Sequence, residues 1–252
     1  MSQLEVKDLS ISFGGVKAVR DVSFRVEKGA VYSIIGPNGA GKSTVFNLVT
    51  RVITPDAGQV RFEGEDLLTI APSRIARQGV ARTFQNLELF PDASVADNIL
   101  VGRHIHFSTS PVAELLGLGS VRRQEAENRE KVDEILSLLG LESHRNTPVG
   151  SLPYGICKIV ELARALACEP RLLLLDEPAA GLNTAETDRM ASWIEEVNHR
   201  LGITIVLIEH DMRLVSRVSH RVLALNAGRV LTEGTALEVQ THPDVIKAYL
   251  GG

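Results

Sequence analysis

Val31-Tyr-Ser-Ile-Ile35 runs directly into Gly36-Pro-Asn-Gly-Ala-Gly-Lys-Ser43, and the type of fold can be inferred from this junction. The apolar run predicts a buried strand, and the glycine-rich segment fits the pattern G-x-x-x-x-G-K-[ST] that leads into a helix, here Lys42 to Thr50. In such a loop the backbone N–H groups surround phosphate oxygens, Lys42 reaches the β- and γ-phosphates, and Ser43 can ligate Mg²⁺. A purely structural glycine turn explains the match less well, because strand and helix patterns flank it. We therefore expect a nucleotide phosphate site here.

A second apolar run, Leu172 to Leu175, ends in two acids, Asp176 and Glu177. In open α/β sheets the carboxyl ends of the strands form the ligand-binding edge. Next to a bound phosphate, Asp176 would hold Mg²⁺ and Glu177 would polarise the attacking water. Strand ends are commonly polar, so two solvated acids explain this pair equally well when it is taken alone. The phosphate loop makes the catalytic interpretation the stronger one.

Two further strand candidates deliver polar side chains to the same edge. Ile203 to Ile208 runs into Glu209-His210-Asp211, where His210 is the candidate, and Val80 to Phe84 is followed by Gln85. A neutral imidazole can hydrogen-bond a γ-phosphate or the attacking water, and an amide oxygen can ligate a metal or orient water. A lone histidine is more often structural than catalytic, and Gln85 by itself carries no signal. Both assignments therefore depend on the neighbouring motifs.

Strand and helix patterns alternate along most of the chain, which predicts an α/β fold with a mostly parallel sheet. Before the phosphate loop, alternating apolar residues predict an N-terminal antiparallel β layer with a bulge near Asp8. Between Ser94 and Gly150 the strand signals stop and helical spacing begins, so we expect an α-helical subdomain inserted into a single domain of 252 residues. Short strands at 221–225 and 230–233 and a helix from Pro243 to Tyr249 are expected last.

The composition excludes several classes of protein. Lys plus Arg number 27 and Asp plus Glu 31, and a net charge of −4 provides no basic field that would attract nucleic acid. The longest apolar runs are strand-sized, far below the roughly 20 residues that span a bilayer. The start Met1-Ser-Gln-Leu-Glu5 lacks the features of a secretory signal, which favours a cytosolic protein. The two cysteines, Cys157 and Cys168, provide neither a disulfide framework nor a zinc site.

The order of these motifs resembles the ATP-binding subunit of an ABC transporter, a P-loop ATPase, over nearly the whole chain. The insertion between His104 and Arg123 is similar to that of the larger of the two ATPase subunits that such systems often carry. Four stretches make the branched-chain amino acid importer type the most similar, namely Arg82-Thr-Phe-Gln-Asn86, the tyrosine in Leu152-Pro-Tyr-Gly-Ile156, Glu177-Pro-Ala-Ala-Gly-Leu-Asn183 and the ending Pro243-Asp-Val-Ile-Lys-Ala-Tyr-Leu-Gly251.

The resemblance implies roles that the motifs alone do not assign. Phe13 would stack on adenine, with a core aromatic of the β layer as the alternative, and Asn183 would lie at a dimer seam. Gln85 would couple Mg²⁺ and the membrane partner to the catalytic centre. Family members pair head to tail, so each ATP site takes its phosphate loop from one subunit and its Leu-x-x-Gly segment from the other. The expected nucleotide contacts are Phe13, Asn38, Gly39, Ala40, Gly41, Lys42, Ser43, Thr44, Tyr154, Gly155 and Asn183; the expected catalytic residues are Glu177, His210 and Gln85, and the expected metal ligands are Ser43, Gln85 and Asp176.

One segment departs from the family pattern. Pro153 stands where the family has Ser or Ala, and Ile156 stands where it has Gln, so a serine hydroxyl that would donate to a γ-phosphate is absent. A charge-assisted hydrogen bond contributes about 1.5–3 kcal/mol. The absence of the hydroxyl therefore predicts weaker binding or slower turnover of ATP at the site that this segment completes. The Gly155 N–H and the helix N-terminus remain as donors, and relatives with Ala already lack the hydroxyl. An undiminished site is therefore an equally good alternative.

These expectations describe an ATPase, with ATP and Mg²⁺ as cofactors, that powers a membrane importer for branched-chain or related amino acids. We expect it at the cytoplasmic face of the inner membrane, bound to permease subunits and to an identical or different second ATPase subunit. A solute-binding protein would be an indirect partner, and nucleic acid would not be one. The alternative is a weakly hydrolysing or regulatory subunit of a system with a different cargo, such as urea, an aromatic acid or a lipid. ABC-type ATPases of DNA repair are disfavoured, because they carry very long coiled coils and the helical section here is under 60 residues.

Overall fold

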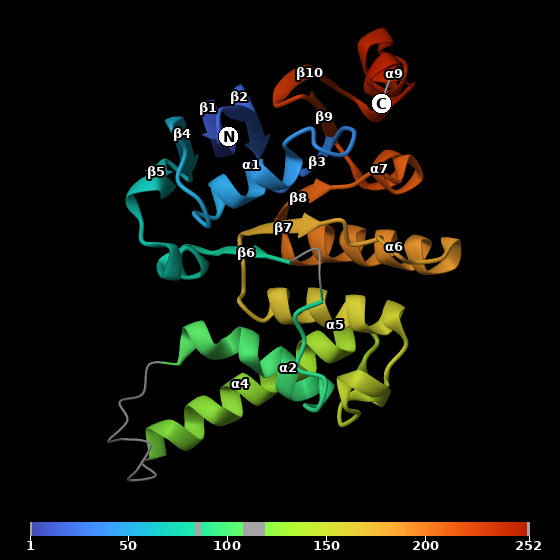
Figure 1. Ribbon diagram of the computed structural model, residues 1–252. Coiled ribbons are helices and arrows are strands. Elements are labelled where there is room, and N and C mark those ends of the chain that lie inside the picture. The colour runs from blue at the N-terminus through green and yellow to red at the C-terminus, as the bar shows by residue number, and fades with distance from the viewer. Residues whose placement is uncertain (1, 84–86, 108–118, 251–252) are drawn as a thin grey trace. The chain divides into compact units, whose positions relative to one another are not determined.

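The computed structural model describes residues 2–83, 87–107 and 119–250 (Figure 1). Contacts divide the chain into two compact units. The sheet unit consists of Met1–Arg82 and Arg171–Gly252, and the helical unit consists of Thr83–Pro170. The helical unit contains the section 94–150 in which helical spacing was expected, and it also contains the helix that follows this section.

The small sheet of the sheet unit is antiparallel and has the strand order β2-β1-β4-β5. It comprises β1 (Ser2–Phe13), β2 (Val16–Glu27), β4 (Ala57–Phe62) and β5 (Glu65–Asp66). The predicted bulge is confirmed, since Asp8 has a φ of +49° and the β1–β2 register shifts between Val6 and Leu9. The sequence analysis did not predict β4 or β5. β4 buries only Val60 and Phe62, and β5 has two residues, so neither produces a long alternating pattern.

The large sheet has the strand order β10-β9-β3-β8-β7-β6. The strands from β9 to β6 run parallel, and β10 pairs antiparallel with β9, which confirms the predicted α/β fold with a mostly parallel sheet. Every residue of β3, β7 and β8 is buried, as expected of parallel strands that are covered on both faces. The strands are β3 (Val31–Ile35), β6 (Val80–Arg82), β7 (Leu172–Asp176), β8 (Thr204–Ile208), β9 (Arg221–Asn226) and β10 (Arg229–Gly234).

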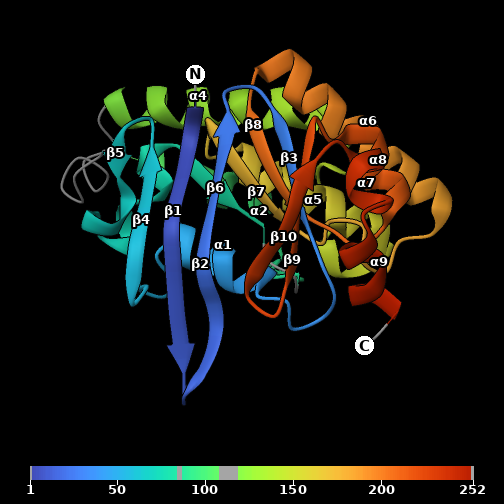
Figure 2. The same cartoon turned by 90° about the horizontal axis from the view of Figure 1, so that it is seen from above.

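Each face of the large sheet is covered by a different set of elements. On one face, α1 (Lys42–Val49) and the small sheet pack against alternate residues such as Ile34 and Leu223. On the other face, the neighbouring residues Ile35 and Val222 pack against three C-terminal helices. The strands are thus fixed by apolar contacts on both faces, and their carboxyl ends remain as the open edge. The three C-terminal helices are α7 (Met212–Val218), α8 (Ala236–Gln240) and α9 (Pro243–Leu250). Figure 2 shows them with α6 (Thr184–Leu201) beside them.

The helical unit is built on α2 (Val95–Gly102), α4 (Gly119–Leu138) and α5 (Tyr154–Leu166), which contact one another pairwise. Arg103 follows α2 and joins the three, because its buried side chain donates to Asn128 Oδ1 of α4 at 2.9 Å and to Ala167 O after α5 at 3.1 Å. Val132 and Leu136 are buried, as the helical spacing predicts. Most of the predicted insertion 104–123 lies outside the described residues or without described side chains.

Short 3₁₀ turns complete both units. They are Leu67–Thr69, Pro72–Arg74 and Ala76–Gln78 in the sheet unit, and Arg103–His106, Glu142–His144 and Val149–Ser151 in the helical unit. Within the part of the chain that the structure describes, no helix combines the length and the apolar character needed to cross a membrane.

Candidate functional site

The predicted phosphate loop, Gly36 to Ser43, connects the carboxyl end of β3 to the first turn of α1. Two of its glycines have backbone conformations and neighbours that exclude a side chain. Gly36 has a φ of +150°, and a Cβ there would lie 2.2 Å from Leu225 O of β9. Gly41 has a φ of +100°, and a Cβ there would lie 2.6 Å from Ala18 O of β2. The loop backbone is therefore held between β9 and β2, which fixes its curvature.

Lys42 is buried inside this loop. Its Nζ donates hydrogen bonds to Gly36 O at 2.7 Å and to Pro37 O at 3.1 Å. Burial lowers the pKa of the Lys42 ammonium, whereas the charges of Glu177 and Asp176 raise it. The ammonium is thus held by two loop carbonyls and attracted by the charges of the two acids. A phosphate that binds in the loop can take the place of the two carbonyls as its partner.

The predicted acids Asp176 and Glu177 lie at the carboxyl end of β7, which is separated from β3 by β8. Ile208 of β8 pairs with Ile34 of β3 on one side and with Asp176 of β7 on the other, so these three strand ends lie side by side, as Figure 1 shows. Glu177 comes directly after β7, and its N–H donates to Ile208 O at 2.9 Å. The structure therefore brings Lys42, Asp176 and Glu177 to one edge of the sheet.

Asp176 is buried and forms an ion pair with Arg82, whose Nη2 lies 2.7 Å from Asp176 Oδ2. Arg82 Nη1 also donates to Asn47 Oδ1 of α1 at 2.6 Å, so the guanidinium joins β6, β7 and α1. Burial raises the pKa of Asp176, although the Arg82 hydrogen bond and charge lower it. The sequence analysis used Arg82 only as a marker of resemblance and missed this contact, which joins residues 94 positions apart.

Glu177 has a φ of +50°, in the left-handed region that non-glycine residues rarely occupy. Such a conformation costs on the order of 1–3 kcal/mol and persists where the surrounding structure enforces it, most often at functional sites. Here the bond from Glu177 N–H to Ile208 O holds the backbone in this conformation. The strained backbone is consistent with the predicted catalytic role of Glu177.

Glu209, between β8 and His210, is fully buried. Its carboxylate accepts hydrogen bonds from the N–H groups of Ala179 at 2.8 Å and His210 at 2.9 Å. Burial raises the pKa of Glu209, while these backbone donors lower it. Glu209 therefore joins the segment after β7 to the segment after β8. The sequence analysis assigned it no role, although an acid that ends an apolar strand is a signal that could have identified it.

The other predicted site residues occupy varied positions. The His210 side chain is 61% exposed, with Nδ1 3.8 Å from Glu209 Oε2. Phe13 is 49% exposed, so it is not a core aromatic of the β layer.

Asn183 is the N-cap of α6, where its side chain accepts from Glu186 N–H at 3.0 Å. Gln85 lies outside the described residues. Tyr154 and Gly155 belong to the helical unit, at the start of α5.

The chemistry of this edge fits a nucleotide and Mg²⁺. The loop N–H groups, Lys42 and the N-terminus of α1 are donors suited to phosphate. Ser43 and Asp176 would supply oxygen ligands, and no group of three or more His, Cys, Asp or Glu residues able to hold a metal occurs among the described residues. Mg²⁺ characteristically uses one or two protein oxygens together with substrate phosphates and water, so this sparse ligand set suits it.

Comparisons with known families and proteins agree with this geometry. The ABC transporter family profile matches residues 19–180, and the branched-chain amino acid ATP-binding cassette transporter profile matches residues 229–252. The chain is 43% identical to the high-affinity branched-chain amino acid transport ATP-binding protein BraF of Pseudomonas aeruginosa, over 98% of this chain and 97% of BraF. It is 41% identical to the protein LivG of the same description from Escherichia coli K12, over 100% of this chain and 99% of LivG.

Solved structures show the same similarity. A nucleotide-free ATP-binding cassette from an ABC transporter superposes with a TM-score of 0.87 at 32% identity, and each chain is fully covered. An ATP-binding cassette of an ABC transporter in its ADP conformation superposes with a TM-score of 0.88, also at 32% identity and with both chains fully covered.

Replacing Arg82 with methionine tests the buried ion pair. Removal of one partner from such a pair costs about 3–5 kcal/mol, so we expect a loss of this size in the free energy of unfolding at neutral pH. Because Arg82 lowers the pKa of Asp176, its removal should raise the pKa of the Asp176 carboxyl further. The loss should shrink as the pH falls toward that pKa and the carboxyl takes up a proton. Denaturation at pH 7.5 and pH 5 measures both effects.

Arg200→Met is the matched control, because Arg200 forms an exposed ion pair with Glu196 on α6. Exposed pairs contribute only about 0–1 kcal/mol, so this variant should unfold much like the parent at both pH values. An Arg82→Met variant as stable as Arg200→Met, with the same pH dependence, would contradict the assigned electrostatics.

Proposed function

The chain belongs to the ABC transporter family as an ATP-binding subunit, and from this membership we propose that it hydrolyses ATP to drive the import of branched-chain amino acids. The observation that carries the proposal is the meeting of Lys42, Asp176 and Glu177 at the carboxyl edge formed by the parallel strands β3, β8 and β7. The match of residues 229–252 to the branched-chain amino acid profile and the names of the relatives support the cargo. They do not favour the alternative of a regulatory subunit with a different cargo.

In the proposed mechanism the phosphate loop and Lys42 bind the β- and γ-phosphates. When bound, Mg²⁺ would neutralise phosphate charge and would be held by Ser43 and Asp176. Glu177 would orient and polarise the attacking water, and its backbone is held directly after β7 by the bond from its N–H to Ile208 O. His210 would hydrogen-bond the γ-phosphate or that water, and its backbone N–H is held by Glu209.

We further propose that two ATP-binding subunits pair, with Pro153, Tyr154 and Gly155 facing the phosphate loop of the partner. α5 starts at Tyr154 without a side-chain cap, so its first N–H groups are available to an anion. The thiol of Cys157 donates back to Val149 O at 3.6 Å, inside the helical unit, and is not directed at a ligand. Asn183, exposed at the start of α6, would lie at the same seam.

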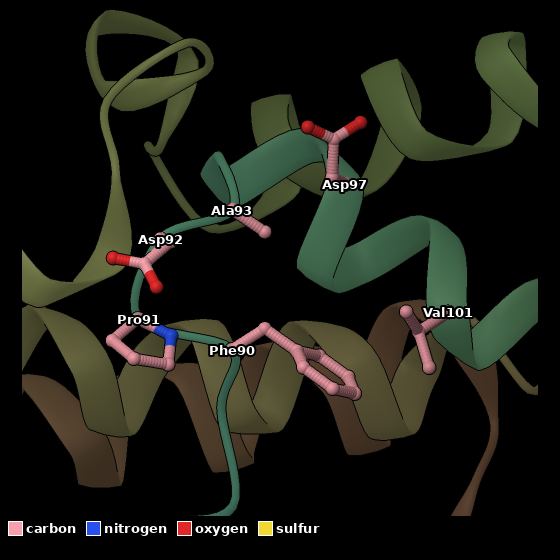
Figure 3. A pocket seen from close by; sticks show the side chains of 6 residues that line it. All are labelled: Phe90, Pro91, Asp92, Ala93, Asp97 and Val101. Carbon is pink, nitrogen blue, oxygen red and sulfur yellow. The ribbon is translucent and has the colours of Figure 1, made fainter.

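The membrane partner needs a surface, and we propose that the permease contacts a hollow of about 530 Å³ in the helical unit (Figure 3). Phe90 is 54% exposed and Val101 46% exposed, and both line this one hollow, where they form a contiguous apolar surface with Pro91 and Ala93. Asp92 and Asp97 supply polar groups at its edge. An apolar floor with a polar rim is typical of a docking site for another protein.

Glu177→Gln tests the catalytic assignment. Removal of the carboxylate charge should lower phosphate release by about 100-fold or more, because a general base contributes roughly 10²–10⁴-fold. The glutamine retains the shape of the side chain, so ATP should still bind and should trap a dimer. Phosphate release, nucleotide affinity and size-exclusion chromatography with ATP measure the three effects.

Glu130→Gln, on the exposed face of α4, is the control and should hydrolyse ATP at the parent rate. If Glu177→Gln also retained the parent rate, Glu177 would not have the role given to it.

Phe90→Asp tests the docking hollow. A charge placed on the exposed apolar floor should reduce co-purification with the permease subunits by about tenfold, since truncation of a central apolar contact commonly costs over 1 kcal/mol. Val52→Asp, at another exposed valine, should co-purify like the parent. Melting curves establish that both variants are folded. Equal co-purification of the two variants would exclude the hollow as the docking surface.

A further inference from the structure

The buried carboxylate of Glu209 binds two segments of the candidate site, one with each oxygen. Its Oε1 accepts the backbone N–H of Ala179 at 2.8 Å, in the segment that follows β7. Its Oε2 accepts the N–H groups of His210 at 2.9 Å and Asp211 at 3.3 Å, in the segment that follows β8. A side chain with a single acceptor oxygen cannot serve both segments in this way. The carboxylate therefore connects them.

The segment after β7 is fastened to the end of β8 at two points. The N–H of Glu177 donates to the carbonyl of Ile208, the last residue of β8, at 2.9 Å. The next residue along the chain, Glu209, accepts the N–H of Ala179. The backbone on both sides of Pro178 is thus held by consecutive residues of the β8 end. The direction in which the Glu177 side chain leaves the backbone depends on both bonds.

The bond to Ala179 also reaches the start of α6. Two turns close the chain between β7 and this helix, since Ala180 N–H donates to Glu177 O at 3.1 Å and Leu182 N–H donates to Ala179 O at 3.1 Å. Ala179 lies inside the first turn and begins the second. Asn183, the N-cap of α6, follows directly. A single anchor at Ala179 therefore holds a short stretch with Glu177 at one end and Asn183 at the other.

A buried carboxylate makes strict demands on its neighbours. Removing its charge from water is costly, and hydrogen bonds to both oxygens are needed to offset the cost. The two segments must therefore stay within hydrogen-bond distance of the same group. The segment after β8 is itself held in place, because the Asp211 side chain caps α7 by accepting from Arg213 N–H at 2.8 Å.

We propose that Glu209 is a positioning residue for ATP hydrolysis, which holds His210 at a fixed distance from Glu177 by binding the backbone of both segments. The γ-phosphate contact and the water-polarising carboxylate are then aligned before the nucleotide arrives. This inference deepens the proposed ATPase function and rests on it.

The effect should appear in the chemical step and not in nucleotide binding. The hydrogen bonds of Glu209 go to the segments after β7 and β8, whereas the phosphate loop follows β3 and is held between β9 and β2. A displacement of about 1 Å in a catalytic group can cost 100-fold in rate. A fall in kcat with little change in the KM for ATP is the signature of such a role.

Glu209→Gln in the full-length chain keeps the shape of the side chain. The amide has one oxygen, so one of the two segments loses its acceptor whichever way the amide turns. We expect kcat to fall about tenfold or more and the KM for ATP to change less than about threefold. Phosphate release at a temperature where the variant is folded, as established by its melting curve, measures both parameters.

Thr204→Val, at the opposite end of β8, is the matched control. The Thr204 hydroxyl is also buried and also joins distant segments, since it accepts Gly29 N–H at 2.7 Å and donates to Gln3 Oε1. Both variants should have a lower melting temperature than the parent, because each deprives a buried N–H of its acceptor. Only Glu209→Gln should lose activity, and Thr204→Val should keep kcat within about twofold of the parent.

A parent-like kcat in Glu209→Gln would overturn the proposal, and so would an equal loss of kcat in the two variants, because Glu209 would then only stabilise the fold. A measurement on the parent covers the case in which Glu209→Gln does not fold. Without nucleotide, the Ala179 amide should exchange its hydrogen as slowly as the amides of β8, and fast exchange would contradict the bridge. A parent chain that does not hydrolyse ATP would instead refute the proposed function, and the exchange of the Ala179 amide would still decide the contact.

Discussion

The register of three parallel strands is the constraint on which the rest of the site depends. Ile34, Ile208 and Asp176 lie in line across β3, β8 and β7. Because the strands are parallel, the segments that follow them emerge at one edge, and residues far apart in the sequence meet there. A shift of one residue in this register would turn the Asp176 side chain to the opposite face of the sheet. The apolar cover on both faces of the sheet makes such a shift costly.

Three charged side chains are buried near this edge, and each has a compensating ion pair or hydrogen bonds. Asp176 pairs with Arg82, and Glu209 accepts backbone N–H groups from the segments that follow β7 and β8. The Lys42 ammonium is held by loop carbonyls and lies in the field of Asp176 and Glu177. A fixed arrangement of charge and donors of this kind can accept the negative charge of a triphosphate with little rearrangement, which is the main electrostatic requirement for phosphoryl transfer.

Much of the fold could be predicted from the sequence, because its main elements are contiguous patterns. The phosphate loop, the apolar strands and the two acids after Leu175 are local signals, and the order of these elements implies a shared edge. The contacts of Arg82 and Glu209 could not be predicted, since each joins segments that become neighbours only in the folded chain. β4 and β5 were missed for a related reason, because short strands are defined by their partners more than by their own pattern. The roles of Phe13, Asn183 and Gln85 stay predictions from the resemblance.

A crystal structure with Mg²⁺ and a non-hydrolysable ATP analogue would show whether Lys42, Asp176 and Glu177 surround one nucleotide. We expect one nucleotide at the carboxyl edge of the large sheet, with Lys42 Nζ on its terminal phosphates, the metal beside Ser43 and Asp176, and the Glu177 carboxylate facing the γ-phosphate. A nucleotide bound elsewhere, or side chains of Lys42, Asp176 and Glu177 that do not surround the same triphosphate, would contradict it.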